Sequence, residues 1–132
     1  MVIKNEFGIF EVDISKTKQY YKRKHPCECD LCVFFRERIG DAEPKLVEFL
    51  EGFGVNAAEP DEINISFEDG EMYSYRDVNY TVCGRIKAVA PNVLLAGSNI
   101  ELCFENGFCC PNSQEGEYFT ICTESTITIP KQ

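Results

Sequence analysis

The chain has no tryptophan and only one histidine, His25, among its 132 residues. Any catalytic triad that needs an imidazole would depend on that single side chain. No apolar run approaches the roughly 18 residues that a membrane-spanning helix requires. The acidic residues lack the spacing of a calcium-binding loop, and the glycines form no phosphate-binding motif. These absences remove the common enzyme signatures, and we expect a protein without catalytic activity.

Positive charge is also scarce, since 13 Lys and Arg stand against 22 Asp and Glu, for a net charge of −9. Such a surface repels phosphate backbones and anionic lipids, so we expect neither a nucleic-acid nor a membrane partner. It suits a basic protein partner, because opposite charges speed association and help to select the partner. One basic run within residues 16–24 departs from this balance, and we expect it to form a solvated strand or loop.

The first residues, Met1 to Glu6, do not show a charged segment followed by an apolar one. That pattern marks exported proteins, so a cytoplasmic location is expected. Eight cysteines are many for such a protein. Because cytosolic thiols stay reduced, disulfides explain them poorly. Metal ligation, packing as small apolar groups and redox chemistry remain as explanations.

The most specific motif is a C-x-C-x-x-C segment formed by Cys27, Cys29 and Cys32. A closed zinc site needs four tetrahedral ligands, with zinc–sulfur bonds of about 2.3 Å. The x₂ spacing of Cys29 and Cys32 allows one turn to surround a metal, and Cys27 can add a third thiolate from extended chain. The sequence therefore predicts a structural zinc site, with ordinary surface or core cysteines as the alternative. The candidates for the fourth ligand are His25, Cys109 and Cys110.

Two further roles for this cysteine segment are less well supported. A cysteine nucleophile needs a base and an oxyanion site, but His25 lies across a proline from Cys27 and no glycine-rich nest is nearby. A redox pair needs a lowered thiol pKa, which the neighbouring carboxylates Glu28 and Asp30 oppose. A thiol switch therefore stays open as an alternative to zinc, and a catalytic cysteine is disfavoured.

The pattern of apolar residues predicts an α+β fold in one domain, residues 1–132. A strand is expected over 7–14, a helix from Asp30 to Ile39, and a second helix with Asp41 as its candidate N-cap, Pro44 in its first turn and Gly52 or Gly54 at its end. From Ile63 onward the apolar period is two, with a hairpin at Asp69-Gly70, strands over 72–75, 79–87 and 118–129, and one or two strands within 93–104. Short connections favour a mainly antiparallel sheet of five or six strands, with the two helices packed on one face.

Three more cysteines share a register in the predicted strands. Cys83, Cys103 and Cys122 each point away from the apolar side of their strand. Unbonded cysteine is among the most buried residue types, so we expect these side chains to fill gaps on a partly covered face. A thiol or metal cluster on that face is the alternative.

Several segments resemble a family of small uncharacterised bacterial proteins. They are the cysteine segment 25–34, the F-L-x-x-F-G-V stretch at 49–55, the P-x-E stretch at 60–62 and residues 80–86. In size and acidity the members look like immunity proteins of bacterial toxin systems. The resemblance implies a bacterial, cytosolic protein of one domain. Together with the net charge of −9, the missing catalytic constellation and the small size, it leads to the hypothesis of a non-catalytic binding protein whose acidic surface binds a basic protein, in the manner of an immunity-type inhibitor. The alternative is a zinc- or thiol-dependent protein centred on Cys27, Cys29 and Cys32.

Overall fold

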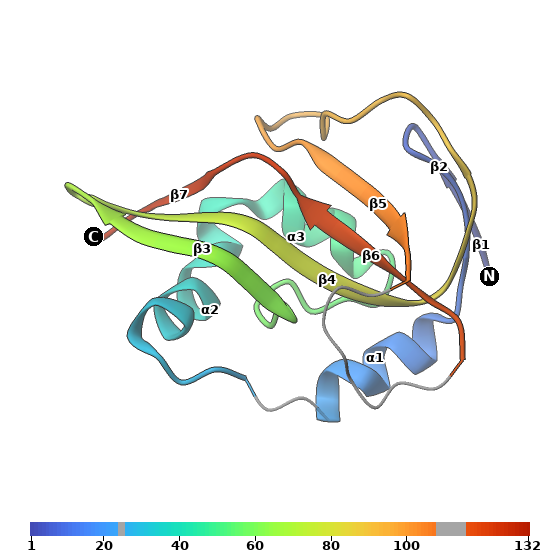
Figure 1. Cartoon of the computed structure of the whole chain (residues 1–132), viewed down its shortest axis with the longest axis horizontal. Helices are drawn as coiled ribbons and strands as arrows, with labels where there is room; N and C mark the ends of the chain where they lie inside the picture. The colour runs from blue at the N-terminus through green and yellow to red at the C-terminus, as the bar shows by residue number, and fades with distance from the viewer. Residues whose placement is uncertain (24–25, 108–115) are drawn as a thin grey trace.

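One long strand, β4 (Met72–Val89), organises the sheet in the computed structural model, which describes residues 1–23, 26–107 and 116–132. Along one edge β4 pairs with β3 and then with β2, and along the other with β7 and then with β6. Every pairing is antiparallel, and β1 and β5 extend the sheet outward from β2 and β6 (Figure 1). The other elements are β1 (Val2–Asn5), β2 (Gly8–Val12), α1 (Ile14–Arg23), α2 (Asp30–Ala42), α3 (Pro44–Glu51), β3 (Glu62–Asp69), β5 (Leu102–Asn106), β6 (Tyr118–Thr123) and β7 (Ile127–Pro130).

This architecture confirms the predicted α+β class and corrects its details. The sheet has seven strands rather than five or six, because residues 2–5 form a strand with β2 and the last predicted strand divides into β6 and β7. The two strands expected over 72–75 and 79–87 are one strand with an irregularity at Asp77, whose φ is 53°. The register against β3 is the same before and after Asp77, and the hydroxyls of Tyr75 and Tyr80, on either side of it, donate to the carbonyls of Leu31 and Ala57.

The structure has a third helix, α1, where the basic run was expected to form a strand or loop. The Asp13 carboxylate accepts a hydrogen bond from the backbone N–H of Lys16 at 2.9 Å, which caps the first turn. Thr17 and Tyr21, four residues apart, are the buried side chains of the helix. The lysines that dominate this segment lie on the other faces of the helix. Because of them, the helical spacing of the buried residues could not be recognised in the sequence.

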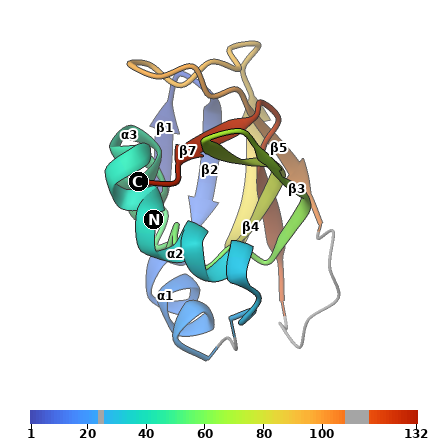
Figure 2. The ribbon, with the colours of Figure 1, turned by 90° about the vertical axis from the view of Figure 1, so that its left-hand side faces the viewer.

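The other two helices agree with the sequence in position and differ in their ends. Cys29, rather than Asp30, is the N-cap of α2, and the helix continues through Gly40 to Ala42. Glu43, rather than Asp41, is the N-cap of α3, because Asp41 belongs to the last turn of α2; Pro44 in the first turn and Gly52 after the end agree with the prediction. The three helices lie on one side of the strands (Figure 2).

An aromatic cluster joins α3 to the sheet. The Phe7 ring packs edge-on against Phe49 at 5.2 Å between centroids, and Phe10 packs against Phe53 at 5.5 Å. Phe119 of β6 stacks on Phe10 at 5.6 Å. Burying such rings removes large apolar areas from water, and this contact fixes the sheet beneath the helices. Within the described part of the chain, no helix is both long and apolar enough to cross a membrane.

Candidate functional site

The three cysteines of the C-x-C-x-x-C segment come together in the structure. The sulfur atoms of Cys27, Cys29 and Cys32 all lie within 4.8 Å of one another. Sulfurs bound tetrahedrally to zinc at about 2.3 Å would be about 3.8 Å apart. Movements of about 1 Å or less would therefore bring these sulfurs to bonding distance. Residues 26–107, together with the two described ends of the chain, contain no other group of three metal-ligating side chains this close.

The start of α2 creates this arrangement. Cys29 has an extended backbone, with φ −66° and ψ 155°, and forms the N-cap. Its sulfur accepts a hydrogen bond from the backbone N–H of Cys32 at 3.4 Å. An N-cap side chain turns back over the first helical turn, so the sulfurs of Cys29 and Cys32 meet on the same side. Cys27 approaches from the extended chain that precedes the helix.

The cluster is open to solvent on one side and anchored on the other. Cys27 and Cys29 are exposed, and Cys32 is half-buried. The hydroxyl of Tyr75 on β4 donates to the carbonyl of Leu31 at 2.7 Å. Arg36 donates to the carbonyl of Cys27 at 3.3 Å. The segment is thus held at both ends while its sulfurs stay accessible to an ion from solution.

The surroundings shift the pKa values of Cys29 and Cys32 in opposite directions. The backbone N–H of Cys32 lowers the pKa of Cys29, and side-chain hydrogen bonds from Cys32 and Cys27 act in the same direction. Burial raises the pKa of Cys32 to about 12, and the neighbouring sulfurs of Cys29 and Cys27 add to this rise. The cluster favours one negative charge on Cys29 and disfavours a second on Cys32. A bound cation would remove that penalty.

The predicted fourth ligands, His25, Cys109 and Cys110, lie outside the described residues. The three strand cysteines do not form a metal-binding group in the described chain. Cys103 lies directly opposite Cys122 between β5 and β6, whereas Cys83 lies opposite Tyr118. Cys83 is buried, and Cys103 and Cys122 are half-buried. They occupy a partly covered face, as the sequence predicted.

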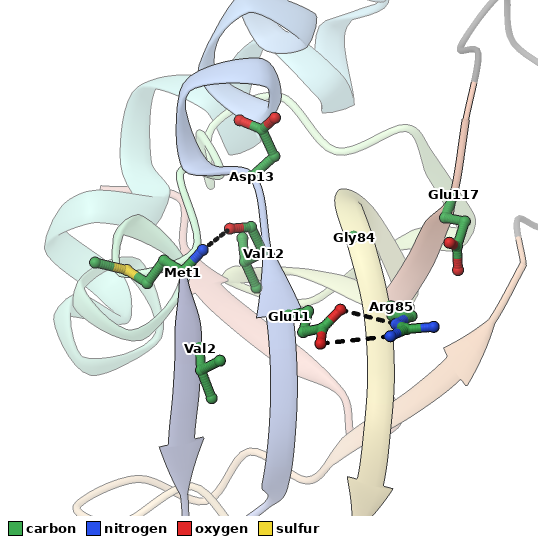
Figure 3. A pocket seen from close by; sticks show the side chains of 8 residues that line it. All are labelled: Met1, Val2, Glu11, Val12, Asp13, Gly84, Arg85 and Glu117. Atoms are coloured by element: carbon green, nitrogen blue, oxygen red, sulfur yellow. Dashed lines mark hydrogen bonds and ion pairs between the residues drawn. The ribbon is translucent and has the colours of Figure 1, made fainter.

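A pocket of about 560 Å³ opens beside the end of β2 (Figure 3). Glu11 accepts hydrogen bonds there from Arg85 at 2.8 Å and from Lys87 at 3.0 Å. The hydrogen bond from Arg85 has the larger effect and that from Lys87 the next, and together they lower the pKa of Glu11 to about 2. The carboxylate is engaged with two cations of its own sheet, and we assign this pocket no chemistry.

A second surface feature, which the sequence did not single out as a site, is the acidic edge strand β3. Residues 59–71 contain six Asp and Glu and no Lys or Arg. Two apolar side chains of the strand, Ile65 and Phe67, are 44% and 40% exposed. The sequence feature that could have indicated this surface is the set of acidic residues on both sides of a stretch in which apolar and polar residues alternate.

The sheet register explains why these apolar side chains are exposed. Ser66 lies opposite Tyr75, and the Tyr75 ring packs on Phe35 of α2. Because successive strand residues point to opposite faces, Ile65 and Phe67 point away from the helices. The alternation therefore predicted the strand correctly, but it does not mark a core-facing row at these two positions.

No protein-family model matches the chain, and no curated protein and no solved structure matches it. The resemblance carried by residues 25–34, 49–55, 60–62 and 80–86 therefore stays a prediction. The geometry of the cysteine cluster and of the acidic strand supplies the arguments that follow.

Proposed function

We propose that this chain is a metal-binding protein that holds a zinc ion on Cys27, Cys29 and Cys32. The observation that carries the proposal is the convergence of three sulfurs within 4.8 Å at the start of α2. Thiolates are ligands that Zn²⁺ prefers, and their tetrahedral arrangement tolerates the small adjustment needed here. His25, Cys109 and Cys110 remain the candidates for the fourth ligand.

The ion would have a structural role. Residues 26–28 belong to no helix or strand, and zinc would fix them to the first turn of α2. The proposed role is therefore binding of the ion, and no reaction is assigned to the site. A reversible thiol switch on the same sulfurs is the competing use of this geometry.

Metal analysis of protein purified without chelator tests this proposal. We expect about one zinc per chain, in keeping with a closed structural site. The variant Cys29→Ser should lose the metal, and the matched variant Cys103→Ser should keep it, because Cys103 is a half-buried strand cysteine outside the cluster. Less than about 0.2 zinc per chain in the wild-type protein, even after incubation with zinc and removal of the excess, would refute the site.

A second function is supported by the charge of the surface. We infer that the chain binds a basic protein partner in the manner of an immunity-type inhibitor in the cytoplasm. The supporting observation is the net charge of −9, concentrated in the run of six carboxylates over residues 59–71. Complementary charge would accelerate association with a basic surface and reject acidic partners.

A pull-down at low and high salt tests this second function. Proteins recovered at low ionic strength should be basic, and their recovery should fall steeply as salt shortens the range of electrostatic attraction. Recovery of no protein at low salt, or of the same proteins at every salt concentration, would count against the inference. The zinc and partner proposals are compatible, since Cys29→Ser can remove the metal while partner binding survives.

A further inference from the structure

We propose that the free edge of β3 is a docking strand, to which an extended basic segment of a partner protein adds as the next strand of the sheet. The proposal rests on the acidic binding function above and assigns that function a place. In this mode of recognition, main-chain hydrogen bonds supply affinity, and alternate side chains supply specificity.

The geometry of β3 meets the first requirement, an available edge. β3 keeps one register against β4 from Glu62 to Asp69, interrupted only at Asn64 and Asp77, and pairs with no other strand of the described chain. Natural edge strands are commonly protected by lysine, proline or a bulge. β3 has no lysine, proline or register shift, and its charged side chains, Glu62, Glu68 and Asp69, are all acidic, so they oppose an acidic strand but not a basic one. Its eight residues are therefore long enough to template a basic strand.

The side chains of β3 supply a second feature of a docking strand. Ile65 and Phe67, both exposed, lie on the face of the sheet away from the helices. An added strand would place every second side chain beside them. Apolar or β-branched residues of the partner at those positions would cover Ile65 and Phe67.

Charge identifies the chemistry of the occupant. Carboxylates lie at both ends of the strand, with Glu62 at its start and Glu68, Asp69 and Glu71 around the hairpin. Of these four side chains, only Glu68 forms a described ion pair, with Lys131. A partner strand with Lys or Arg near its ends would meet opposite charge at both ends of β3.

A second copy of this chain fits the edge poorly. In a two-fold antiparallel pairing centred on β3, Glu62 of one copy would lie opposite Asp69 of the other, twice per interface. Like charges directly opposite one another destabilise a strand pair. Each copy also carries a net charge of −9. The distribution of charge therefore favours a basic partner over self-pairing.

The test uses the full chain and a synthetic peptide of alternating lysine and valine. Hydrogen exchange should slow at the amides of residues 62–69 when the peptide binds, because an added strand protects edge amides. The double variant Glu62→Lys/Asp69→Lys should weaken binding by about tenfold or more. The matched double variant Glu37→Lys/Glu48→Lys carries the same net charge, with its changes at exposed positions of α2 and α3, and should bind within about twofold of wild type.

Each of the following outcomes would overturn a stated part of the proposal. If both double variants lose affinity equally, or if protection appears elsewhere than at residues 62–69, the docking strand is refuted while the acidic binding function stands. If neither the peptide nor polylysine binds at low salt, the acidic binding function fails as well. If the chain dimerises with protection at residues 62–69, the edge is used by a second copy and the proposed partner is wrong. Hydrogen exchange on the wild-type protein tests the docking strand even if a variant fails to fold.

Discussion

The hydroxyl of Tyr21 takes the place of a missing strand beside Thr81. It donates to the Thr81 carbonyl at 2.8 Å and accepts from the Thr81 N–H at 2.9 Å. Thr81 lies in β4 between the stretch paired with β3, which reaches Asn79, and the stretch paired with β2, which begins at Gly84. A helical side chain thus satisfies two backbone groups in a gap of the sheet edge.

The residues around this gap complete the same arrangement. The Thr17 hydroxyl accepts from the Cys83 N–H at 3.0 Å, and the Asp13 N–H donates to the Cys83 carbonyl at 2.9 Å. The Asp61 carboxylate accepts from the Tyr20 and Thr81 hydroxyls. Buried backbone groups need partners, and α1 with its preceding residue Asp13 supplies them here.

We predict that Tyr21→Phe destabilises the fold. The change leaves the buried N–H and carbonyl of Thr81 without the hydroxyl, at a cost of about 1–3 kcal/mol for each unsatisfied group. Urea unfolding followed by circular dichroism would measure it. Tyr73→Phe removes the same atom from a half-buried tyrosine that packs on Phe34, and it should change the free energy of unfolding by less than about 0.5 kcal/mol. Equal stability of the two variants would contradict the proposed role of Tyr21.

Gly84 should tolerate no side chain. Its φ is 150°, and a Cβ atom there would lie 2.0 Å from the carbonyl oxygen of Glu11 on β2. Gly84→Ala should separate the strands and cost at least about 2 kcal/mol. Gly40→Ala is the contrasting change, because Gly40 lies within α2 with nothing near its Cβ position. It should stabilise the protein by about 0.5–1 kcal/mol, and the two variants should therefore shift Tm in opposite directions.

The ion pairs of Glu11 predict a pH dependence in acid. The pKa of Glu11 is about 2 in the folded protein, against an ordinary value of 4.5. A depressed folded-state pKa gives stability that is present above the unfolded value and is lost as pH falls towards the folded one. The Tm difference between wild type and Glu11→Gln should therefore be constant above about pH 5 and shrink between about pH 4.5 and pH 2. NMR titration of Glu11 with a midpoint near its ordinary value of 4.5 would contradict the prediction.

Metal loading should stabilise the protein through the cysteine cluster. An ion that binds only the folded state adds about 2.7 kcal/mol at a free concentration about 100 times its dissociation constant. Zinc should raise the Tm of wild type and of Cys103→Ser, a chelator should reverse the rise, and Cys29→Ser should not respond. Equal responses of the two cysteine variants would show that the stabilising ion binds elsewhere.

The same measurement identifies the fourth ligand. If His25 completes the site, His25→Ala should weaken zinc binding, whereas Cys109→Ser and Cys110→Ser should not. The opposite pattern assigns the ligand to the Cys109-Cys110 segment. Unchanged affinity in all three variants would leave the fourth position to water and contradict a closed structural site.

The sequence by itself determined the features that depend on neighbours along the chain. The period-two pattern after Ile63, the Asp69-Gly70 turn and Pro44 at the start of α3 each follow from local backbone preferences, and the structure confirms them. The spacing of Cys27, Cys29 and Cys32 likewise brought three sulfurs to one turn, because a helix start fixes positions three residues apart.

Only the tertiary structure decided which faces are covered and which strand edges are left open. Ile65 and Phe67 fit the local pattern of core residues, but they are exposed because β3 lies at the edge and no helix covers that face in the described chain. The helix α1 was not predicted for a related reason, because its buried Tyr21 forms its hydrogen bond with Thr81, 60 residues away. Contacts between distant segments leave no period in the sequence, and burial depends on them.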